Sequence, residues 1–479
     1  MFFNSISFFV FLFITFLLFW KISGFSSLWG KVVLLISSYV FYGWWDWRFL
    51  ILIIISSATD FFIGQLIFKS ADKKRRKMLL LISIFVNIGI LFVFKYFNFF
   101  IDSIQSLIGV FTTESHWSTL HIILPVGISF YTFQTLSYTI DIYKRKIEPT
   151  NSALTFFTFV AFFPQLVAGP IERAAKLIPQ FEKKPVFSYP QATSGLKLIL
   201  WGLFKKMVIA DQLSVIVDSV YANPNNFTGW GVVFATFLFG FQIYSDFSGY
   251  SDIAIGTARL FSIELMINFR TPYFANSFHN FWHRWHISLS TWFRDYVYIP
   301  MGGSKGNHHK RNILITFLVS GLWHGANITF VLWGGIHGLF YIIEQQVSRL
   351  IHINKGVKSV SGFMLTFILV NLSWLFFRAE SLTHLQNLTA TIFSADAENL
   401  TGFLRLIFEN GNFTEQGRVL VFVFPVFIII ELFIGERTFA DLLENSPKPV
   451  RWSFYYVVFM AILFFGVINA APSFIYFQF

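Results

Sequence analysis

The chain has no cysteine among its 479 residues, and only 13% of its residues are charged. Without cysteine, the protein itself forms no disulfide, thiolate zinc site, iron–sulfur cluster or thioester. An ordinary soluble domain carries about 25% charged residues. The low charge content, together with 55% hydrophobic residues, therefore excludes a water-soluble globule. Any acyl chemistry must proceed without a cysteine nucleophile.

Apolar runs recur along the whole chain, with no soluble block between them. A helix of roughly 20 apolar residues crosses a hydrocarbon core of about 30 Å, and unpaired backbone groups are not tolerated in lipid. We therefore predict an all-α, polytopic membrane protein that forms one domain over residues 1–479, with roughly eleven to twelve transmembrane helices. The candidate spans lie near residues 5–20, 30–45, 49–68, 78–100, 120–142, 195–222, 229–260, 312–333, 335–352, 360–377, 419–435 and 452–471.

Hydropathy alone does not decide how two of the apolar segments are arranged. Residues 5–20 resemble a signal-peptide core, but no basic residue precedes them and no small-residue cleavage pattern follows. We expect them to remain as the first span. The segment 152–168 lies between the basic segments Lys144–Lys146 and Lys183–Lys184, which are both expected in the cytoplasm. Both ends of 152–168 are therefore expected on that side of the membrane. Since Pro164 and Pro170 interrupt its helical ladder, we predict a re-entrant element lined by protein.

The formal net charge of +11 results from 36 Lys and Arg against 25 Asp and Glu. The basic residues collect in short loops between apolar runs, which is typical of cytoplasmic loops and does not require a nucleic-acid partner. The strongest such loop is Lys69–Lys77. Three predicted spans precede it, so the N-terminus is expected outside the cytoplasm. The same rule places Lys305–Arg311 inside, Thr112–Thr119 outside, and the tryptophans of Trp44–Trp47 in an aromatic belt at the outer interface.

The segment Phe278–Pro300 is the most polar stretch in an aromatic setting, with three histidines, two arginines and one aspartate. Ionisable side chains at membrane depth are costly unless paired or hydrated, so they are candidates for function. We predict a helix or re-entrant hairpin that lines a wet cavity and ends at the turn Met301–Gly303. Arg294 and Asp295 are adjacent and project differently from one helix, so each is expected to need its own partner.

A second polar stretch, Ser320–Asn327, lies inside the span predicted near 312–333. His324 follows Arg311 by 13 residues, which corresponds to about 20 Å along a helix. That depth is past the middle of a hydrocarbon core of about 30 Å. The flanking glycines allow close approach of a backbone or a ligand, and Asn327 is expected one turn further on. We interpret His324 as a functional residue.

A third polar stretch, Gln242–Asp252, contains two aspartates in an apolar neighbourhood. Asp246 and Asp252 are expected to pair with Arg284 or Arg294, or to orient a histidine.

These residues suit acyl transfer from a thioester to a hydroxyl, which requires removal of the hydroxyl proton and stabilisation of the developing oxyanion. Histidine suits the first task because its unperturbed pKa of about 6.5 lies near working pH. A histidine near the membrane midplane can be reached by a donor from one side and an acceptor from the other. The connecting channel can then be too narrow for either molecule to cross.

Two other classes of function compete with acyl transfer. His279, His283 and His286 have i, i+4, i+7 spacing, which would place them on one helical face as a metal site requires. Together with the histidines at 308, 309, 324 and 337 they resemble the histidine-rich segments of membrane di-iron oxygenases, but paired histidine boxes of the H-x-x-H-H kind are absent. No H-E-x-x-H pattern occurs either, which removes the usual zinc-protease pattern. A transporter or channel would explain intramembrane charge, yet no two-fold repeat is visible.

At these residues the sequence resembles the membrane-bound O-acyltransferase family, and within it the bacterial alginate/peptidoglycan O-acetyltransferase branch. The likeness covers most of the chain and is specific in the motif core 242–341. Its motifs are Arg284–Ser290, Trp292–Tyr296, Tyr298–Gly303, Leu322–Asn327, Tyr244–Asp252, Met1–Ser5, Trp374–Arg378 and Phe474–Phe479.

The resemblance implies that His324 is the family's essential histidine and that His286 is its second characteristic polar position. It also implies a multi-helix membrane fold with a central funnel. The site residues that we expect to bind substrate or support the histidines are Trp323, Asn327, Arg284, Arg294, Asp246, Ser288 and Tyr298. No metal or bound cofactor is expected. His324 could act as a general base or as a transient acyl relay, and the roles of His279 and His283 stay open.

For partners, the resemblance implies acetyl-CoA as the cytoplasmic donor and an extracytoplasmic polysaccharide as the acceptor, in a bacterial cytoplasmic (inner) membrane. Lys305, Lys310 and Arg311 could meet the phosphates of the donor, although a positive-inside loop explains them equally well. In related systems a periplasmic or surface esterase-like protein completes the transfer. Within acyl transfer, the alternative is D-alanyl transfer from a carrier protein.

Overall fold

The structure is a computed structural model that describes residues 1–108, 123–167, 169–350, 355–394, 413–444, 446–467 and 474–475. Every regular element in these ranges is a helix, which confirms the predicted all-α class. The chain divides into two compact units. The first comprises Met1–Thr193 and Thr257–Met266, and the second comprises Ser194–Gly256 and Ile267–Phe479. The predicted outer loop Thr112–Thr119 and most of the terminal motif Phe474–Phe479 lie outside the described residues.

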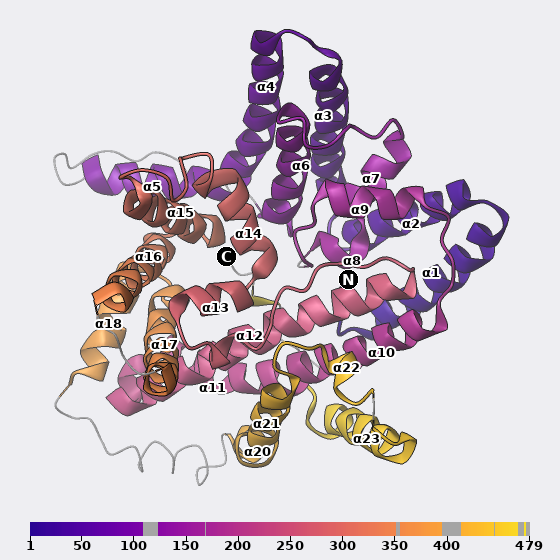
Figure 1. Cartoon of the computed structure of the whole chain (residues 1–479). Coiled ribbons are helices and arrows are strands. Elements are labelled where there is room, and N and C mark those ends of the chain that lie inside the picture. The colour runs from indigo at the N-terminus through magenta and orange to yellow at the C-terminus, as the bar shows by residue number, and fades with distance from the viewer. Residues whose placement is uncertain are drawn as a thin grey trace. The chain divides into compact units, whose positions relative to one another are not determined.

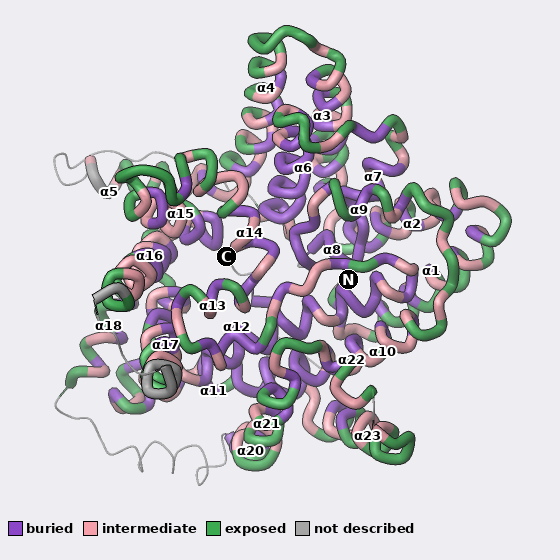
Figure 2. Tube along the Cα trace, in the orientation of Figure 1, coloured by how far each residue is buried: buried purple, intermediate pink, exposed green. Residues whose placement is uncertain are grey.

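The first unit begins with the packed pair α1 (Ile6–Phe25) and α2 (Ser27–Gly43). A short 3-10 turn, η1 (Trp47–Phe49), leads into α3 (Leu50–Lys69), which lies beside α4 (Lys73–Leu91) and α6 (Ile128–Tyr143) (Figure 1). α4 continues through the π-helical η2 (Phe92–Tyr96) into α5 (Phe97–Ile108). α6 is buried along almost its whole length (Figure 2). The tryptophans of the predicted aromatic belt, Trp44, Trp45 and Trp47, are exposed at the connection between α2 and α3.

The segment 152–168 contains a broken helix, as its prolines predict. α7 (Ala153–Ala161) and α8 (Phe163–Leu166) are both too short to cross a bilayer, and α9 (Ala174–Glu182) follows them. The break lies at Phe162, whose ψ of 107° leaves the helical region. Pro164 sits within the first turn of α8, where its missing N–H costs nothing. That this element enters the membrane and returns stays a prediction.

The second unit is arranged around α12 (Gly229–Leu260), a helix of 32 residues that is mostly buried (Figure 2). α10 (Tyr189–Leu203) continues through the π-helical η3 (Phe204–Ala210) into α11 (Asp211–Ala222). α10 packs on α12 at glycines: a Cβ on Gly202 would lie 2.5 Å from the carbonyl oxygen of Gly249. Two 3-10 turns, η4 (Pro224–Asn226) and η5 (Pro272–Phe274), flank α12 in sequence.

The segment 278–298 forms a broken helix of three pieces, α13 (Phe278–Arg284), α14 (Ile287–Phe293) and the π-helical η6 (Arg294–Tyr298), followed by the predicted glycine turn. The turn uses positive φ at Gly302 and Gly303. The remaining helices are α15 (His309–His324), α16 (Ile328–Leu350), α17 (Lys355–Arg378), α18 (Leu382–Ile392), α20 (Thr414–Arg418), η7 (Val419–Val423), α21 (Phe424–Ile434), α22 (Phe439–Leu442) and α23 (Lys448–Phe465).

The single span predicted near 312–333 is wrong. α15 ends at His324 and a new helix begins at Ile328. Gly325 adopts an extended conformation, with φ −156° and ψ 149°, which cannot continue the helix. The Oδ1 atom of Asn327 then accepts a hydrogen bond from the backbone N–H of Thr329 at 3.1 Å and starts α16. Asn327 is therefore not one helical turn beyond His324.

Five helical stretches in the described ranges are long and apolar enough to cross a membrane: Ile6–Phe25, Trp47–Lys69, Lys73–Gln105, Val360–Arg378 and Glu415–Ile434. Their apolar windows are only 22–39% buried, as expected for helices that face lipid. The predicted count of eleven to twelve spans is not confirmed. α2 and α15 are shorter, with 17 and 16 residues, so hydropathy alone does not decide whether such helices span.

The close packing of α15 on α16 yields a first prediction. A Cβ on Gly334 would overlap the backbone carbonyl of Phe317, whereas one on the neighbouring Gly335 would meet only a methyl group of Leu318, at 3.3 Å. We expect Gly334→Ala to lower the free energy of unfolding by about 1–3 kcal/mol because the backbones must separate. Gly335→Ala is the matched control and should be neutral or stabilising. Thermal unfolding in detergent measures both, and equal midpoints would contradict the packing.

Candidate active site

His324 is the last residue of α15, and its side chain lies in an aromatic cluster. It is only 2% exposed. Its ring centroid lies 5.0 Å from that of Trp323, 5.2 Å from that of Trp333 and 5.5 Å from that of Phe377. The aromatic walls exclude bulk water from the ring.

His286 joins the same cluster from the break between α13 and α14. Its backbone is left-handed, with φ 43° and ψ 55°, and its side chain is fully buried. Its ring centroid lies 6.4 Å from that of His324 and 6.1 Å from that of Trp323. A non-glycine residue with this conformation is uncommon and stores strain, which is frequent at functional sites. The structure thus brings together the two histidines that the sequence singled out.

The three-histidine face behind the metal interpretation does not form. α13 ends at Arg284 and Trp285 is extended, so His286 leaves the helix that carries His279 and His283. His279 and His283 remain one turn apart, with ring centroids separated by 4.3 Å, and both are exposed. No group of three side chains suited to a metal ion occurs in the part of the chain that the structure describes. The i, i+4, i+7 spacing aligns three side chains only on a continuous helix, and this helix is broken.

Asn268 holds the start of α14, the helix that His286 precedes. The backbone N–H of Ile287 donates to the Asn268 carbonyl oxygen at 2.9 Å, and that of Ser288 donates to Asn268 Oδ1 at 3.2 Å. Asn268 Nδ2 in turn donates to Ser251 Oγ at 3.3 Å. Asn268 is 1% exposed. It therefore satisfies N–H groups that a helix start otherwise leaves unpaired, and it fixes the backbone beside His286.

We predict that Asn268 positions His286. Asn268→Ala should lower the rate of acyl transfer by about tenfold to a hundredfold, because a displacement near 1 Å can cost that much. The informative comparison is a double-mutant cycle with His286→Ala. If Asn268 acts through His286, adding Asn268→Ala to His286→Ala should cause no further loss of activity. Two losses that multiply would show that Asn268 acts elsewhere.

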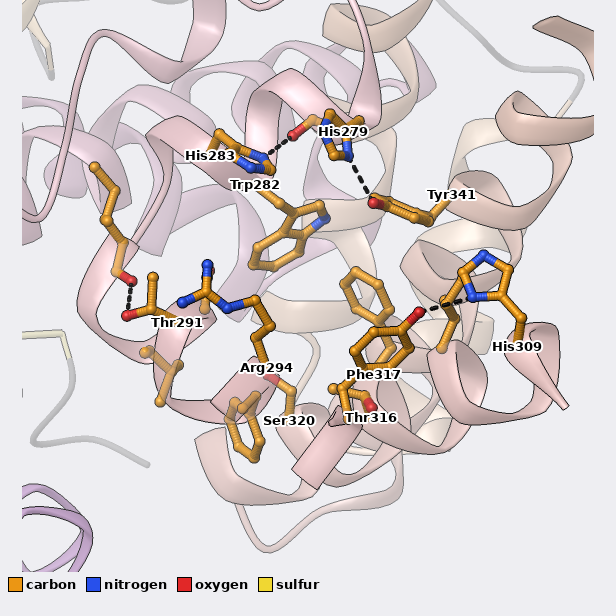
Figure 3. Close-up of a pocket in the computed structure, with 16 residues that line it drawn as sticks. His279, Trp282, His283, Thr291, Arg294, His309, Thr316, Phe317, Ser320 and Tyr341 are labelled. Atoms are coloured by element: carbon orange, nitrogen blue, oxygen red, sulfur yellow. Dashed lines mark hydrogen bonds between the residues drawn. The ribbon is translucent and has the colours of Figure 1, made fainter. Parts of the chain in front are cut away.

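A cavity of about 340 Å³ lies between α13, α14, η6, α15 and α16 (Figure 3). At its edge, His279 Nδ1 is hydrogen-bonded to Tyr341 Oη at 2.6 Å, and His309 Nδ1 to Tyr298 Oη at 2.7 Å. Its lining is mostly apolar or aromatic and comprises His279, Trp282, His283, Ile287, Leu289, Ser290, Thr291, Phe293, Arg294, Tyr298, His309, Ile313, Thr316, Phe317, Ser320 and Tyr341.

Some residues of the cavity lining lie close to the buried histidines. Ser320, in its lining, precedes His324 by one turn of α15, which is about 6 Å along the helix. Phe293, also in the lining, has its ring centroid 6.5 Å from that of Trp323. His324 itself does not line the cavity. A slender group that fills the cavity would therefore stop about one helical turn from the histidine.

Two of the predicted site residues, Arg294 and Tyr298, line this cavity. The expectation that Arg294 and Asp295 need separate partners is wrong. Arg294 Nε donates to Asp295 Oδ1 at 2.8 Å, because the long arginine side chain folds back along its own turn. Asn327 instead supports the connection between α15 and α16, where its Nδ2 donates to the carbonyl oxygen of Glu380 at 2.6 Å.

The predicted aspartate–arginine pairs are also wrong. Asp246 and Asp211 both bind Lys206 Nζ at 2.8 Å, and Asp252 binds Lys205 Nζ at 2.6 Å. Asp246 Oδ2 also accepts a hydrogen bond from the backbone N–H of Ile475 at 2.7 Å. Arg284 pairs with Glu436 at 3.1 Å instead. Lys205 and Lys206 are adjacent charged residues inside the apolar span predicted near 195–222. This pattern could have identified them as partners for the buried aspartates.

Known proteins similar to this chain identify its family. The model of MBOAT, the membrane-bound O-acyltransferase family, matches residues 148–383. The probable alginate O-acetylase AlgI of Pseudomonas aeruginosa is 39% identical over 380 residues, which cover 78% of this chain and 71% of that protein. The chain belongs to the membrane-bound O-acyltransferase family. The resemblance of its motifs is thereby confirmed, and the protein is a multi-pass membrane acyltransferase.

Two further relatives of this membrane-bound O-acyltransferase are similar to it at lower sequence identity. A peptidoglycan O-acetyltransferase of Helicobacter pylori is 34% identical over 388 residues, covering 74% of this chain and 72% of that protein. A teichoic acid D-alanyltransferase of Streptococcus thermophilus is more distant, at 27% identity over 284 residues, covering 53% of this chain and 68% of that protein. His286 and His324 both lie within the matched residues 148–383.

Proposed function

We propose that the protein transfers an acetyl group from a cytoplasmic thioester to an exported polysaccharide, or to a partner protein that acetylates the polysaccharide. The observation that supports this proposal is the buried pair His286 and His324, whose ring centroids are 6.4 Å apart. His324 follows Ser320, a residue of the cavity lining, by one helical turn. The O-acetyl specificity is supported by the names of the alginate and peptidoglycan relatives.

The cavity suits the thioester arm of acetyl-CoA, a slender chain that ends in a small acyl group. Tyr298 and His309 line the cavity, and His309 belongs to the basic segment Lys305–Arg311. That loop is expected in the cytoplasm, so the donor would enter from there. Lys305, Lys310 and Arg311 are all exposed and would meet its phosphates. We also propose that the N-terminus lies outside the cytoplasm and that the protein resides in the cytoplasmic membrane.

In the proposed reaction, His324 acts on the hydroxyl of the acceptor. As a general base it takes the hydroxyl proton while the oxygen attacks the thioester carbonyl, and the new C–O bond replaces the C–S bond. The proton then passes from His324 to the departing thiolate. As a relay, His324 would instead carry the acetyl group for one step. His286 supplies the second polar group of the site in either case.

The oxyanion that forms on the carbonyl needs a hydrogen-bond donor. Trp333 Nε1 is buried and has no hydrogen-bond partner among the residues described, and its ring centroid lies 5.2 Å from that of His324. This indole N–H is a donor that could meet the charge as it develops. All these groups belong to the chain itself, so we propose no bound metal or cofactor, and elemental analysis of the purified protein tests that part.

Donor choice tests the proposal against its nearest alternative, D-alanyl transfer, which the Streptococcus thermophilus relative suggests. Inverted membrane vesicles that contain the protein and enclose the polysaccharide fraction of the host in their lumen are given either labelled acetyl-CoA or a labelled D-alanyl carrier protein from outside. We expect label to pass from acetyl-CoA only. Transfer from the carrier protein alone would establish the alternative, and transfer from neither donor would reject acyl transfer. An esterase-like partner is added in a parallel reaction.

A further inference from the structure

A second cavity, of about 250 Å³, lies within the first unit and has a different chemistry. Its floor is apolar, formed by the buried side chains of Phe19, Leu34, Phe181 and Phe261. Three lysines, Lys31, Lys183 and Lys184, also line it, together with the polar side chains of Ser27, Gln180 and Ser262. The lining is completed by Pro185, Val186 and Ile263. The cavity therefore combines an apolar base with three positive charges.

The three lysines have no carboxylate partner among the described residues. In that part of the chain, no carboxylate oxygen lies within 4.0 Å of the ammonium nitrogen of any of them. Lys31 Nζ donates to the hydroxyl of Thr155 at 3.2 Å, which holds it in place without neutralising it. Like charges around one small cavity repel each other, so binding of an anion there would stabilise the arrangement.

The nearby acids are engaged elsewhere. Glu182 Oε1 accepts a hydrogen bond from Thr150 Oγ1 at 2.9 Å. Glu264 Oε2 pairs with Arg259 Nε at 3.1 Å, and its Oε1 accepts from Gln191 Nε2 at 2.8 Å. Neither acid is available to the cavity lysines in this arrangement. The positive charge is therefore left for a ligand from outside the protein.

The wall of the cavity is preformed. Ser262 Oγ donates to the carbonyl oxygen of Val186 at 2.7 Å, which ties the chain after Lys184 to the end of α12. Gln180 and Glu264 exchange two hydrogen bonds, from Gln180 Nε2 at 3.0 Å and from the backbone N–H of Glu264 at 2.8 Å. Trp20 Nε1 donates to the carbonyl oxygen of Leu260 at 3.0 Å. A ligand would therefore lose little entropy in ordering the site.

Exposed apolar side chains adjoin the cavity lining in sequence. Phe25, Leu28 and Trp29, at the connection of α1 and α2, are 87%, 54% and 60% exposed, and Val186 and Phe187 are 73% and 49% exposed. From their basic residues, both segments are expected at the cytoplasmic interface, where anionic lipid headgroups gather. Such surfaces suit acyl chains, while the lysines suit the phosphate to which those chains are attached.

We propose that this cavity binds the phosphate of an anionic phospholipid, with Lys31, Lys183 and Lys184 around the headgroup and the neighbouring apolar side chains against its acyl chains. The site lies in the first unit, and the proposal does not depend on the transfer chemistry of the second.

The test measures how strongly phosphatidylglycerol raises the thermal midpoint of the purified full chain in neutral detergent. Lys183 and Lys184 are exposed, so Lys183→Gln with Lys184→Gln should leave folding intact. We expect the phosphatidylglycerol concentration at half-maximal stabilisation to rise at least tenfold in this variant. The matched control is Lys73→Gln with Lys74→Gln, which removes two exposed lysines from the first turn of α4 and should leave the value unchanged.

Three further outcomes decide the proposal. Phosphatidylcholine, which carries no net charge, should not stabilise the protein at equal concentration. Equal losses in both double variants would show diffuse attraction of lipid to positive charge and would overturn the site. Full stabilisation by inorganic phosphate alone would overturn the lipid as the ligand, since the acyl chains would then contribute nothing. Lys31→Gln serves as an independent variant and is expected to weaken the same response.

Discussion

Replacing His324 by alanine is expected to lower the rate of acyl transfer at least a hundredfold while the protein remains folded in the membrane. Proton transfer by a positioned side chain is commonly worth about 10²–10⁴-fold in rate. The effect should therefore be large for a base and at least as large for a relay. The measurement is transfer of labelled acetyl groups by membranes whose content of the protein is matched by immunoblot.

The matched control for this variant is His308→Ala, which removes an exposed histidine from the basic loop just before α15. It should retain full activity. The two roles of His324 separate in a rapid-quench experiment, because only the relay forms an acetylated protein that hydroxylamine releases and that His324→Ala lacks. Full transfer by His324→Ala would remove the residue from the mechanism.

The second large effect is expected at Lys206. Lys206 is 2% exposed, and its ammonium nitrogen lies 2.8 Å from carboxylate oxygens of both Asp211 and Asp246, which are themselves buried. Replacing it by methionine leaves two carboxylates facing each other without a counter-charge. Removal of one member of a buried ion pair typically costs about 3–5 kcal/mol. We expect Lys206→Met to reduce the amount of folded protein in the membrane severely.

Restoring neutrality should recover much of this loss. Asp211→Asn combined with Asp246→Asn in the Lys206→Met background removes both unpaired charges, and an asparagine at 246 can still accept the hydrogen bond from the N–H of Ile475. Protein abundance and the thermal midpoint in detergent measure the recovery. A stable Lys206→Met single variant, or a triple variant no better than the single one, would contradict the importance of this charge cluster.

The sequence predicts the helical class because hydropathy, which identifies helices, is local information. His324 stands out as a polar residue in apolar surroundings, whereas only the motif resemblance distinguishes His286 from His279 and His283. The sequence does not predict where α15 ends. Apolar residues on both sides of Ser320–Asn327 favour one continuous span, whereas the extended backbone at Gly325 depends on packing, since a Cβ on Gly325 would overlap the ring of Phe330.

Contacts between distant segments account for the other features of the site that the sequence does not predict. Asn268 holds the backbone of residues 287 and 288, about twenty positions away, and no local pattern marks such a hydrogen bond. Asp246 pairs with Lys206 rather than with an arginine, because η3 and α12 lie together in the second unit. Charge and spacing identify residues that need partners, but only the fold chooses the partner.

The central claim is that the thioester donor occupies the cavity lined by Ser320, one turn of α15 before His324. Since the chain has no cysteine, Ser320→Cys creates a single thiol inside this cavity, and Ser70→Cys provides a control thiol between α3 and α4. The rate of labelling by a small water-soluble maleimide is measured with and without acetyl-CoA. The account predicts that acetyl-CoA slows labelling at position 320 at least fivefold, leaves position 70 unaffected, and that labelling at 320 stops transfer. Equal labelling rates at 320 with and without the donor, or full transfer by the labelled protein, would contradict it.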